Sequence, residues 1–429
     1  MDIANTVEAK SSPLKITIVG AGIGGLAAAI GLRRNGHDVQ VFEKGYMQLP
    51  DQTGAALHLC PNANGILRHW GVHAEKFGGS LMSRYVELSQ DGTTLKDLDL
   101  TESNKRWPHP WHLVQREALH QELKRIATSL EGPGKPVTIL RGEPVDGLDP
   151  ARGTITLRTG GPEVKGDVII GADGIRSTTR KFIKNVEPFP TGKAAYRFVI
   201  ERSKAEEDET TAPLVCQMDT LILWFGQDTR MVMYPCKNNE LLNYVGIHPA
   251  AKSEMNSHNN RTAWNNSATV KQVLETYKDF DPRLKALVGK LDVANHAYAL
   301  KVWQLMDMET LPTWTSGRLA LLGDAAHPFL PYQAQGAAQA IEDAAALSIV
   351  LPQGTPPDEV PERLKLYESI RAERAHRIQD YSRKTGQDWV DGKPVVDMRA
   401  FEEYNFNHDE LAHSAAALKQ WEMSRKPLA

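Results

Sequence analysis

The chain has 429 residues, enough for two or three domains or for one large intertwined unit. Hydrophobic residues make up 41% of it and charged residues 24%, as in soluble globular proteins, which excludes a disordered or fibrous chain. The 50 basic and 53 acidic side chains give a formal net charge of -3, so composition shows no basic surplus that would attract nucleic acid.

Other composition-level features point to an ordinary soluble enzyme or binding protein. The three cysteines are too scattered for a disulfide framework, and no Cys/His spacing indicates a metal site. No apolar run approaches the roughly 18 residues of a membrane-spanning helix. Residues 1–15 lack the apolar core of a secretory signal. These absences predict a cytoplasmic protein in a reducing compartment, a monomer or homodimer with no nucleic-acid or membrane partner.

The N-terminal segment has the pattern of a strand–helix–strand unit. Residues 15–19 form a β-branched run that predicts a buried strand, residues 26–32 predict a helix ending at Gly36, and residues 39–42 predict a second strand. The glycines between the first strand and the helix have GxGxxG spacing, at Gly20, Gly22 and Gly25. In such a turn the first glycine allows the sharp bend, the second lets a pyrophosphate approach, and the third lets helix and strand pack closely.

Glu43 ends the second strand, where a carboxylate accepts hydrogen bonds from an adenosine ribose. The start of the helix would face the phosphates with free N–H groups and the positive end of its dipole. Together these features predict a dinucleotide site. The unit by itself does not distinguish NAD from FAD.

The middle of the chain predicts further strands around a second motif. Pro61 is placed to open a helix, residues 115–126 have helical spacing, and residues 168–170 predict a buried strand that leads into GADGIRS at residues 171–177. Beyond about residue 185, short apolar runs separated by polar turns predict a mostly antiparallel sheet, with strands at residues 196–200, 214–218, 221–225, 230–234 and 241–247. We expect polar loops at residues 203–213 and 251–266.

The C-terminal third is predominantly helical in its pattern. Residues 268–291 have helical spacing, and residues 319–322 predict a buried strand that enters a third motif, GDAAHP at residues 323–328. The remaining predicted elements are an alanine-rich helix, a long amphipathic helix and a C-terminal helix, at residues 335–351, 361–383 and 409–421.

Three separated motifs now occur in one order: the glycine turn with Glu43, residues 171–177, and residues 323–344. Together they resemble the single-component FAD-dependent aromatic hydroxylases, the family of salicylate hydroxylase and 4-hydroxybenzoate 3-hydroxylase, over roughly residues 15–385. The resemblance implies an α/β fold in which a Rossmann-like FAD-binding domain of the glutathione-reductase type carries an inserted, mostly antiparallel substrate sheet and C-terminal helices. It places the FAD-binding domain at residues 15–75, 105–185 and 290–355, the substrate domain at 76–104 and 186–289, and a helical segment at 356–429.

The resemblance also implies noncovalent FAD. Asp324 would accept a hydrogen bond from the ribityl chain, and the helix that starts near Gln335 would direct its N-terminus at the anionic end of reduced flavin. The family usually has a glycine where this chain has Ala334. Arg176 either neutralises a phosphate or pairs with Asp173. The residues expected to bind the cofactor are Gly20, Gly22, Gly25, Glu43, Lys44, Ala55, Arg116, Asp173, Asp324, Gln335, Gly336 and Ala337.

The implied reaction is hydroxylation of a phenolic or aromatic-acid substrate by NADH or NADPH and O2 through a flavin C4a-hydroperoxide, with decarboxylation or dearomatisation as variants. Because no second GxGxxG follows a predicted strand, NAD(P)H is expected to bind transiently in a groove. An epoxidase or indole oxidase on the same scaffold stays open as an alternative. A non-catalytic flavin-binding sensor is the alternative of another class, although it would not need to retain both later motifs.

Four side chains are candidates for contact with the substrate. Arg197 could pair with a phenolate or carboxylate, and Tyr234 matches a substrate-facing tyrosine of the family. Arg230 stands where several relatives have a histidine, and it shares a strand face with Tyr234, so it could supply a second cation. His58, with an ordinary pKa near 6.5, could relay the phenol proton. His327 is expected to be a packing residue near the flavin.

Overall fold

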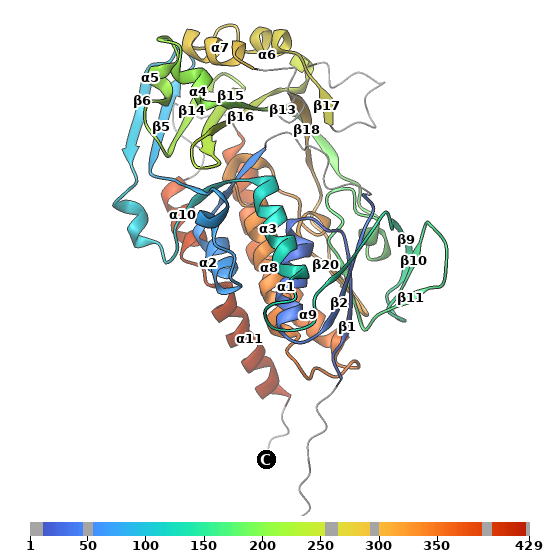
Figure 1. The fold of residues 1–429 in the computed structure, drawn as a ribbon. Helices are drawn as coiled ribbons and strands as arrows, with labels where there is room; N and C mark the ends of the chain where they lie inside the picture. The colour runs from blue at the N-terminus through green and yellow to red at the C-terminus, as the bar shows by residue number, and fades with distance from the viewer. Residues whose placement is uncertain (1–11, 46–54, 254–264, 292–299, 388–396, 426–429) are drawn as a thin grey trace, which may run out of the picture.

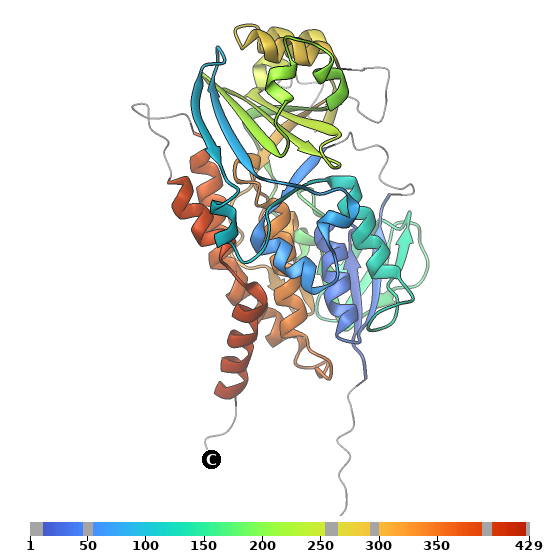
Figure 2. The same ribbon diagram turned by 60° about the vertical axis from the view of Figure 1, so that its left-hand side comes forward.

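The computed structural model describes residues 12–45, 55–253, 265–291, 300–387 and 397–425. Two large sheets lie one above the other, and helices fill the lower layer and cover the outer face of the upper sheet (Figure 1). The last helix extends downward, away from the upper sheet, in both views (Figure 2). None of the described helices combines the length and the apolar character that crossing a membrane requires.

The lower sheet has six strands, and all its pairings are parallel except that of the edge strand β19 with β20. The strands predicted at residues 15–19, 39–42, 168–170 and 319–322 all lie in it, and each is a nearly continuous apolar run because helices or further strands cover both faces. Its order is β19 (Thr315–Ser316), β20 (Leu319–Leu321), β12 (Val168–Gly171), β1 (Lys15–Val19), β2 (Asp38–Glu43) and β8 (Thr138–Arg141).

Two alanine-rich helices, α1 (Ile23–Arg34) and α8 (Gly336–Val350), form the centre of the lower layer. Most of their alanines, including Ala28 and Ala345, are fully buried, and small side chains let the two helices approach closely. The other helices of this layer are α2 (Pro61–His69), α3 (Arg116–Thr128), α9 (Val360–Thr385), α10 (Met398–Phe406) and α11 (Glu410–Ser424). Helix α2 begins at the proline that predicted it, whereas α10 was not predicted.

The upper sheet has eight strands and is antiparallel apart from the pairing of β14 with β5, which confirms the mostly antiparallel prediction. One face packs on α6 (Val270–Thr276) and α7 (Pro282–Gly289) through a core that includes Trp224 and Tyr244. The strand order is β17 (Asn265–Ser267), β18 (Lys301–Asp307), β13 (Phe189–Glu201), β16 (Leu241–Pro249), β15 (Thr229–Cys236), β14 (Thr220–Gly226), β5 (Arg84–Ser89) and β6 (Thr94–Asp99).

Two three-stranded sheets complete the described strands. The first is hydrogen-bonded through Ala56 to side chains of β15 and β16, so it joins the two layers; its order is β3 (Ala56–Leu59), β7 (His112–Gln115) and β4 (Ser80–Leu81). The second sheet packs beside the lower sheet and has the order β11 (Val164–Lys165), β10 (Thr154–Leu157) and β9 (Val145–Asp149).

Two predictions in the 200–291 region were wrong. The expected strand at 214–218 is instead the short helix α5 (Ala212–Val215), and the expected loop before it contains α4 (Arg202–Glu206); the Arg202 guanidinium donates hydrogen bonds to carbonyl oxygens of Val215 and Asn239 and holds this segment in place. The helical spacing predicted at 268–291 is confirmed: it forms two helices, α6 and α7, because Pro282 starts a new helix capped by Asp281. Residues 254–264 of the second expected loop lie outside the described residues.

Candidate active site

The glycine turn after β1 brings α1 into contact with the sheet. Gly20 has a φ of +106°, and a Cβ there would lie 2.4 Å from the carbonyl oxygen of Ala172. A Cβ on Gly25 would lie 2.1 Å from the carbonyl oxygen of Gly20, so neither position accepts a side chain. A Cβ on Gly22, by contrast, would meet no atom within 4 Å. The turn is therefore closed on its inner side and open where a pyrophosphate would lie.

The start of α1 has the features of an anion site. Gly22 is its N-cap, no side chain caps the first turn, and that turn has no acidic residue. Glu43 at the end of β2 accepts hydrogen bonds from the N–H groups of Ala21 and Gly45, both at 2.8 Å, and Lys44 beside it is exposed. Uncapped N–H groups and the helix dipole stabilise a phosphate at this end.

The second motif folds into a turn organised by Asp173. Its carboxylate accepts hydrogen bonds from the hydroxyls of Ser177 and Thr179 at 2.6 and 2.7 Å. It also accepts the N–H groups of Thr178 and Thr179 at 2.7 and 3.0 Å. These four donors make Asp173 the centre of its own loop, while Arg176 is exposed.

Arg180 is a residue of this region that sequence analysis missed. It is 1% exposed, and its guanidinium donates hydrogen bonds to the carbonyl oxygens of Ile175, Val186 and Ala325 at 2.6, 3.1 and 3.1 Å. Ala325 belongs to the third motif, so Arg180 ties the second and third motifs together. An arginine bonded only to backbone oxygens leaves no pattern in the sequence, because its partners can be any residue type.

Asp324 of the third motif is exposed beside buried neighbours. Its side chain is accessible to solvent, yet the surrounding protein desolvates it enough to raise its pKa against the opposing effect of His327 and Arg116. The carboxylate is therefore accessible to a ligand, while the protein around it penalises its charged form. His327 is buried and shares a 2.7 Å hydrogen bond with Asp343, consistent with the packing role expected for it.

The start of α8 lies next to this motif. Ala334 has the left-handed values φ +53° and ψ +24° just before it. Gln335 is its N-cap, is 1% exposed, and makes no capping hydrogen bond with its side chain. The Oε1 atom of Gln335 accepts a hydrogen bond from Asn62 at 3.2 Å, whereas its buried Nε2 has no partner. This unused donor and the first-turn residues Gly336 and Ala337 could therefore hydrogen-bond to a ligand at the start of α8.

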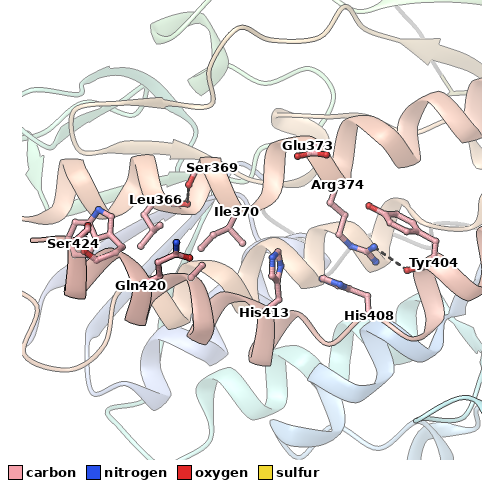
Figure 3. A pocket seen from close by; sticks show the side chains of 12 residues that line it. Leu366, Ser369, Ile370, Glu373, Arg374, Tyr404, His408, His413, Gln420 and Ser424 are labelled. Atoms are coloured by element: carbon pink, nitrogen blue, oxygen red, sulfur yellow. Dashed lines mark hydrogen bonds between the residues drawn. The ribbon is translucent and has the colours of Figure 1, made fainter.

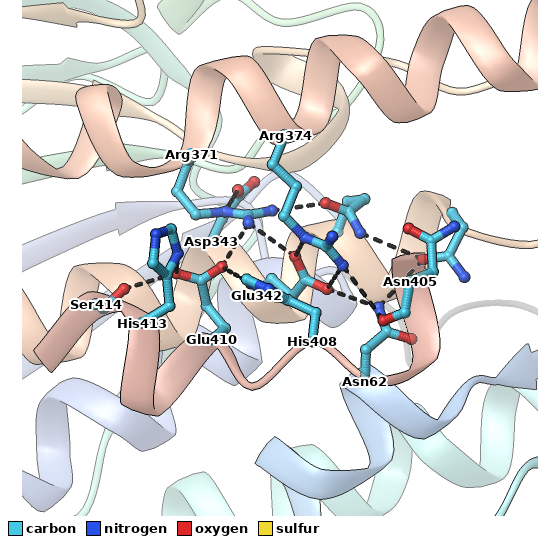
Figure 4. A network of polar contacts seen from close by, with 12 residues as sticks. Asn62, Glu342, Asp343, Arg371, Arg374, Asn405, His408, Glu410, His413 and Ser414 are labelled. Carbon is cyan, nitrogen blue, oxygen red and sulfur yellow. Dashed lines mark hydrogen bonds and ion pairs between the residues drawn. The ribbon is translucent and has the colours of Figure 1, made fainter. Parts of the chain in front are cut away.

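A buried ionic network supports α8 from behind (Figure 4). Asn62 donates a 2.6 Å hydrogen bond to Glu342, and Arg374 donates two to the same carboxylate, both at 2.8 Å. Arg371 donates to Glu342, Asp343 and Glu410 at 2.7, 2.9 and 2.6 Å. Burial acts to raise the pKa of Glu342, but the two guanidiniums outweigh it and hold that pKa below its ordinary value. The network fixes α2, α9 and α11 against the helix that begins at Gln335.

Arg197 on β13 is the most distinctive residue between the two layers. Its pKa is lowered by desolvation, its Nε is buried without a hydrogen-bond partner, and its guanidinium lies 5.7 Å from the ring centre of Trp303. Among the described residues no carboxylate pairs with it. Arg197 lies close enough to Arg116 to help lower the pKa of Arg116. Asp324 acts on Arg116 in the opposite sense, so the three charged groups line one region.

His58 and Tyr234 contact each other beside that region. Their ring centres are 4.7 Å apart, and Trp111 lies 5.7 Å from His58 on another side. Desolvation lowers the pKa of His58 to about 4, and its Nδ1 is buried without a partner. At neutral pH the imidazole is therefore uncharged and a weaker base than the ordinary pKa suggested.

The side chains of Tyr234 and Asn243 both form hydrogen bonds with the backbone of Ala56, in the sheet of β3, β7 and β4. The hydroxyl of Tyr234 donates a 2.8 Å hydrogen bond to the carbonyl oxygen of Ala56, and the Asn243 side chain accepts the N–H of the same residue at 2.9 Å. The two residues are paired across β15 and β16. Next to them, the carbonyl oxygen of Ala55 accepts the N–H of Arg116 at 2.9 Å. The hydrogen bond from the Tyr234 hydroxyl thus links the upper sheet to the sheet of β3, β7 and β4, which joins the two layers.

Arg230 lies on the same strand face as Tyr234 but contacts a different element. Its guanidinium donates hydrogen bonds to the carbonyl oxygens of Thr385 and Gln387, both at 2.8 Å, at the C-terminal end of α9. It also lies 5.5 and 5.4 Å from the ring centres of Phe225 and Tyr332. A cation at this helix end satisfies its last carbonyl groups and its dipole. These contacts are structural, and they compete with the substrate role predicted for Arg230.

The residues present fit FAD. The uncapped start of α1 and the open space at Gly22 suit a pyrophosphate, and Glu43 stands where a ribose would lie. The accessible carboxylate of Asp324 and the unused Nε2 of Gln335 offer further polar groups to the cofactor. Arg116 lies close to both Asp324 and Arg197, so Arg197 is near the groups that would hold the cofactor.

Comparison with known proteins agrees with this fit. The FAD binding domain family matches residues 14–382. The FAD-dependent monooxygenase cfoG of Aspergillus candidus is 34% identical and aligns with 94% of this chain and 91% of its own. Hispidin-3-hydroxylase of Neonothopanus nambi is 30% identical, covering 85% and 86%. The 3-hydroxybenzoate 6-hydroxylase 1 of Aquipseudomonas alcaligenes is 33% identical, covering 86% and 87%.

Solved structures share the fold. CtdE in complex with FAD and a substrate superposes with a TM-score of 0.81 at 23% identity, covering 96% of this chain and all of its own. A salicylate hydroxylase substrate complex superposes with a TM-score of 0.75 at 23% identity, covering 97% and 100%. The chain therefore belongs to the FAD binding domain family and is an FAD-dependent monooxygenase.

Proposed function

We propose that this enzyme hydroxylates a phenolic or aromatic-acid substrate with NAD(P)H and O2, and that Arg197 holds the anionic group of that substrate. The observation that supports this is a desolvated guanidinium with an unused Nε and no carboxylate partner among the described residues. A buried charge without a partner costs several kcal/mol, and a bound phenolate or carboxylate would remove that penalty. Arg116, as a second nearby cation, adds to the attraction for an anion.

The surroundings of Arg197 suit a flat aromatic ring. His58, Trp111 and Tyr234 form an aromatic wall, and Trp303 lies on the other side of the guanidinium. Bound FAD supplies the redox chemistry, taking hydride from NAD(P)H and activating O2. The protein's own contribution is to orient the substrate, to exclude water and to stabilise its anion. His58, neutral at working pH, can hold the substrate hydroxyl by a hydrogen bond.

Two relatives are named for hydroxylation of hispidin and of 3-hydroxybenzoate, which supports the same substrate class here. We expect the nicotinamide cosubstrate to bind only transiently, because the described residues contain one glycine turn of the dinucleotide type and FAD occupies it in the proposed arrangement. An epoxidase or indole oxidase would not need a paired arginine beside the flavin. Arg197 therefore favours the anionic aromatic substrate.

The test is the pair Arg197→Ala and Arg197→Lys, assayed by oxidation of NAD(P)H with a panel of phenols and phenolic acids. We expect at least a tenfold loss of kcat/KM in the alanine variant, or about 1.4 kcal/mol of transition-state stabilisation. The lysine variant should retain part of the rate because it keeps the charge without the bidentate geometry. FAD content should be unchanged, since Arg197 belongs to no flavin motif.

Full, coupled activity in Arg197→Ala would place the substrate anion elsewhere. Oxygen incorporation into neutral alkenes or indoles, with none into phenols, would favour the epoxidase or indole oxidase. Reduction of the flavin by NAD(P)H should also be faster when the correct phenol is present. Equal rates with and without substrate would contradict the proposed aromatic-hydroxylase function.

A further inference from the structure

Two histidines and a buried glutamate meet where α10 is followed by α11. The Nε2 atom of His408 lies 2.8 Å from Oε2 of Glu410, and Nδ1 of His413 lies 3.9 Å from its Oε1. The three ligand atoms are all within 4.8 Å of one another. Figure 4 shows both imidazoles directed at the same carboxylate.

The local sequence explains why these side chains converge. Asp409 caps α11 by accepting the N–H of Ala412 at 3.0 Å, so Glu410 is the first residue of the helix. His413 follows three positions later and lies on the same helix face. His408 precedes the cap and approaches from the connecting turn. The cap thus brings the three side chains close together within a short segment of the chain.

Glu410 is held rigidly. Its Oε2 accepts a 2.6 Å hydrogen bond from Arg371, and its Oε1 accepts one of 2.6 Å from the hydroxyl of Ser414. Its side chain is 0% exposed, whereas His413 is half-exposed and His408 has 17% of its side chain accessible. Supporting hydrogen bonds of this kind orient a carboxylate ligand for a metal ion.

Glu410 belongs to a buried charged network. Three carboxylates, Glu342, Asp343 and Glu410, meet two guanidiniums, Arg371 and Arg374, and His327 also pairs with Asp343. The three carboxylates and two guanidiniums are at most 6% exposed. A carboxylate in such a low-dielectric setting attracts a nearby cation strongly. The two histidines lie between Glu410 and solvent, where an ion could reach it.

We propose that His408, Glu410 and His413 bind one divalent transition-metal ion, of which Zn²⁺ is the best match. Two imidazole nitrogens and one carboxylate oxygen are a ligand set that Zn²⁺ accepts, with bonds of about 2.0–2.2 Å. The observed separations of 2.8 and 3.9 Å bracket the ligand–ligand distances of such a site, so small side-chain rotations suffice. The ion would replace the proton in the hydrogen bond between His408 and Glu410, so that metal binding releases this proton.

The fourth coordination position would face solvent. Both histidines line a groove of about 740 Å³ between α9 and α11, with Tyr404 and Trp421 on its walls (Figure 3). A water molecule or a small anion can complete the coordination from this groove. Because Arg371 connects Glu410 to Glu342 and Asp343 on α8, the ion would fasten the C-terminal helix to the helix that carries Gln335.

The test is titration of the untagged, FAD-loaded enzyme with Co²⁺, followed by equilibrium dialysis and by d–d absorption at longer wavelength than the flavin bands. The variants are His413→Ala and His408→Ala. His73→Ala is the matched control, because His73 lies 3.8 Å from Glu75 but belongs to no described group of three ligands. We expect one Co²⁺ per chain in the wild type and in the control, and binding weakened at least about tenfold in both ligand variants. FAD content should be equal in all four proteins.

Absence of Co²⁺ binding by the wild-type enzyme would overturn the proposal without reference to any variant. Binding that persists unchanged in both His413→Ala and His408→Ala would overturn it as well. His413 is half-exposed, so its loss should not disturb folding, and circular dichroism confirms this for each variant. Zn²⁺ should compete with Co²⁺ for the same site and raise the thermal unfolding midpoint of the wild type but not of His413→Ala.

Discussion

At the scale of single residues, Ala334 adopts a conformation that suits glycine. Its φ of +53° places it in the left-handed region, which costs a residue with a side chain about 1–2 kcal/mol. The sequence showed an alanine where the family usually has a glycine, but it could not show that the local backbone keeps the left-handed form. The residue sits just before α8, where neighbouring packing holds the turn in place.

Ala334→Gly should therefore raise the free energy of unfolding by about 0.5–1 kcal/mol, since relief of strain exceeds the entropy that glycine adds to the unfolded chain. Equilibrium unfolding in urea measures the difference. The matched control is Ala372→Gly within α9, which should lower stability by about 0.5–1 kcal/mol because the backbone there is helical. A destabilised Ala334→Gly would mean that the alanine methyl group makes compensating contacts.

Residue-level roles were also the hardest to predict. Arg197, His58 and Tyr234 do lie together between the two sheets, but their roles toward a substrate stay predictions. Arg230 differs because its partners, the carbonyl oxygens of Thr385 and Gln387, lie about 155 residues away in the chain. No local pattern encodes such a contact, and strand alternation correctly gives its face without giving its partner.

At the scale of elements, two similar substitutions in the glycine turn and α1 should have different effects, one on FAD binding and one on folding. Gly22→Val should fold, because the space at Gly22 is open in the protein itself, but it should lose FAD, whose pyrophosphate would occupy that space. Gly25→Ala should fold poorly, because a Cβ there would lie 2.1 Å from a backbone oxygen. Circular dichroism with flavin absorbance separates the two cases. A yellow Gly22→Val protein with full FAD content would contradict the assignment of this turn.

Elements with a strong local pattern were predicted well, and those shaped by distant contacts were not. The four predicted strands of the lower sheet, β1, β2, β12 and β20, are nearly continuous apolar runs, and α8 and α9 are long enough for helical periodicity to be unambiguous. Residues 214–218 form too short an apolar run to separate strand from helix. An amphipathic pattern predicts that the charged residues of α9 face solvent. Arg371 and Arg374 are instead buried, because their carboxylate partners lie on other helices. The His408, Glu410 and His413 group escaped notice for a related reason: its spacing matches no familiar metal motif.

At the scale of the whole molecule, buried histidines should make stability depend on pH. Desolvation lowers the pKa of both His58 and His248 to about 4, and His248 is fully buried. In the unfolded chain these groups have a pKa near 6.5, so between about pH 6.5 and 4 the unfolded state binds more protons. The free energy of unfolding should fall over that interval, by up to about 1.4 kcal/mol per pH unit for each histidine.

Below about pH 4.5 a second loss should follow, because Glu342 and Asp343 have pKa values held below those of the unfolded chain. Urea unfolding at a series of pH values measures both. His248→Gln should reduce the slope above pH 4.5, whereas His69→Gln, at an exposed position, should leave it unchanged. A stability that is flat from neutral pH down to pH 4.5 would show that these imidazoles are already protonated in the folded enzyme.

The order of strands in the lower sheet also bears on how the chain is made. β1 pairs with β12, and β12 pairs in turn with β20, which is synthesised some 300 residues after β1. Helix α1 likewise buries its alanines against α8, which follows β20. The FAD site therefore cannot close until β20 and α8 have been synthesised. Until then α1 exposes its apolar side chains to solvent. Chaperones and an early supply of FAD would then decide whether the segment folds or aggregates.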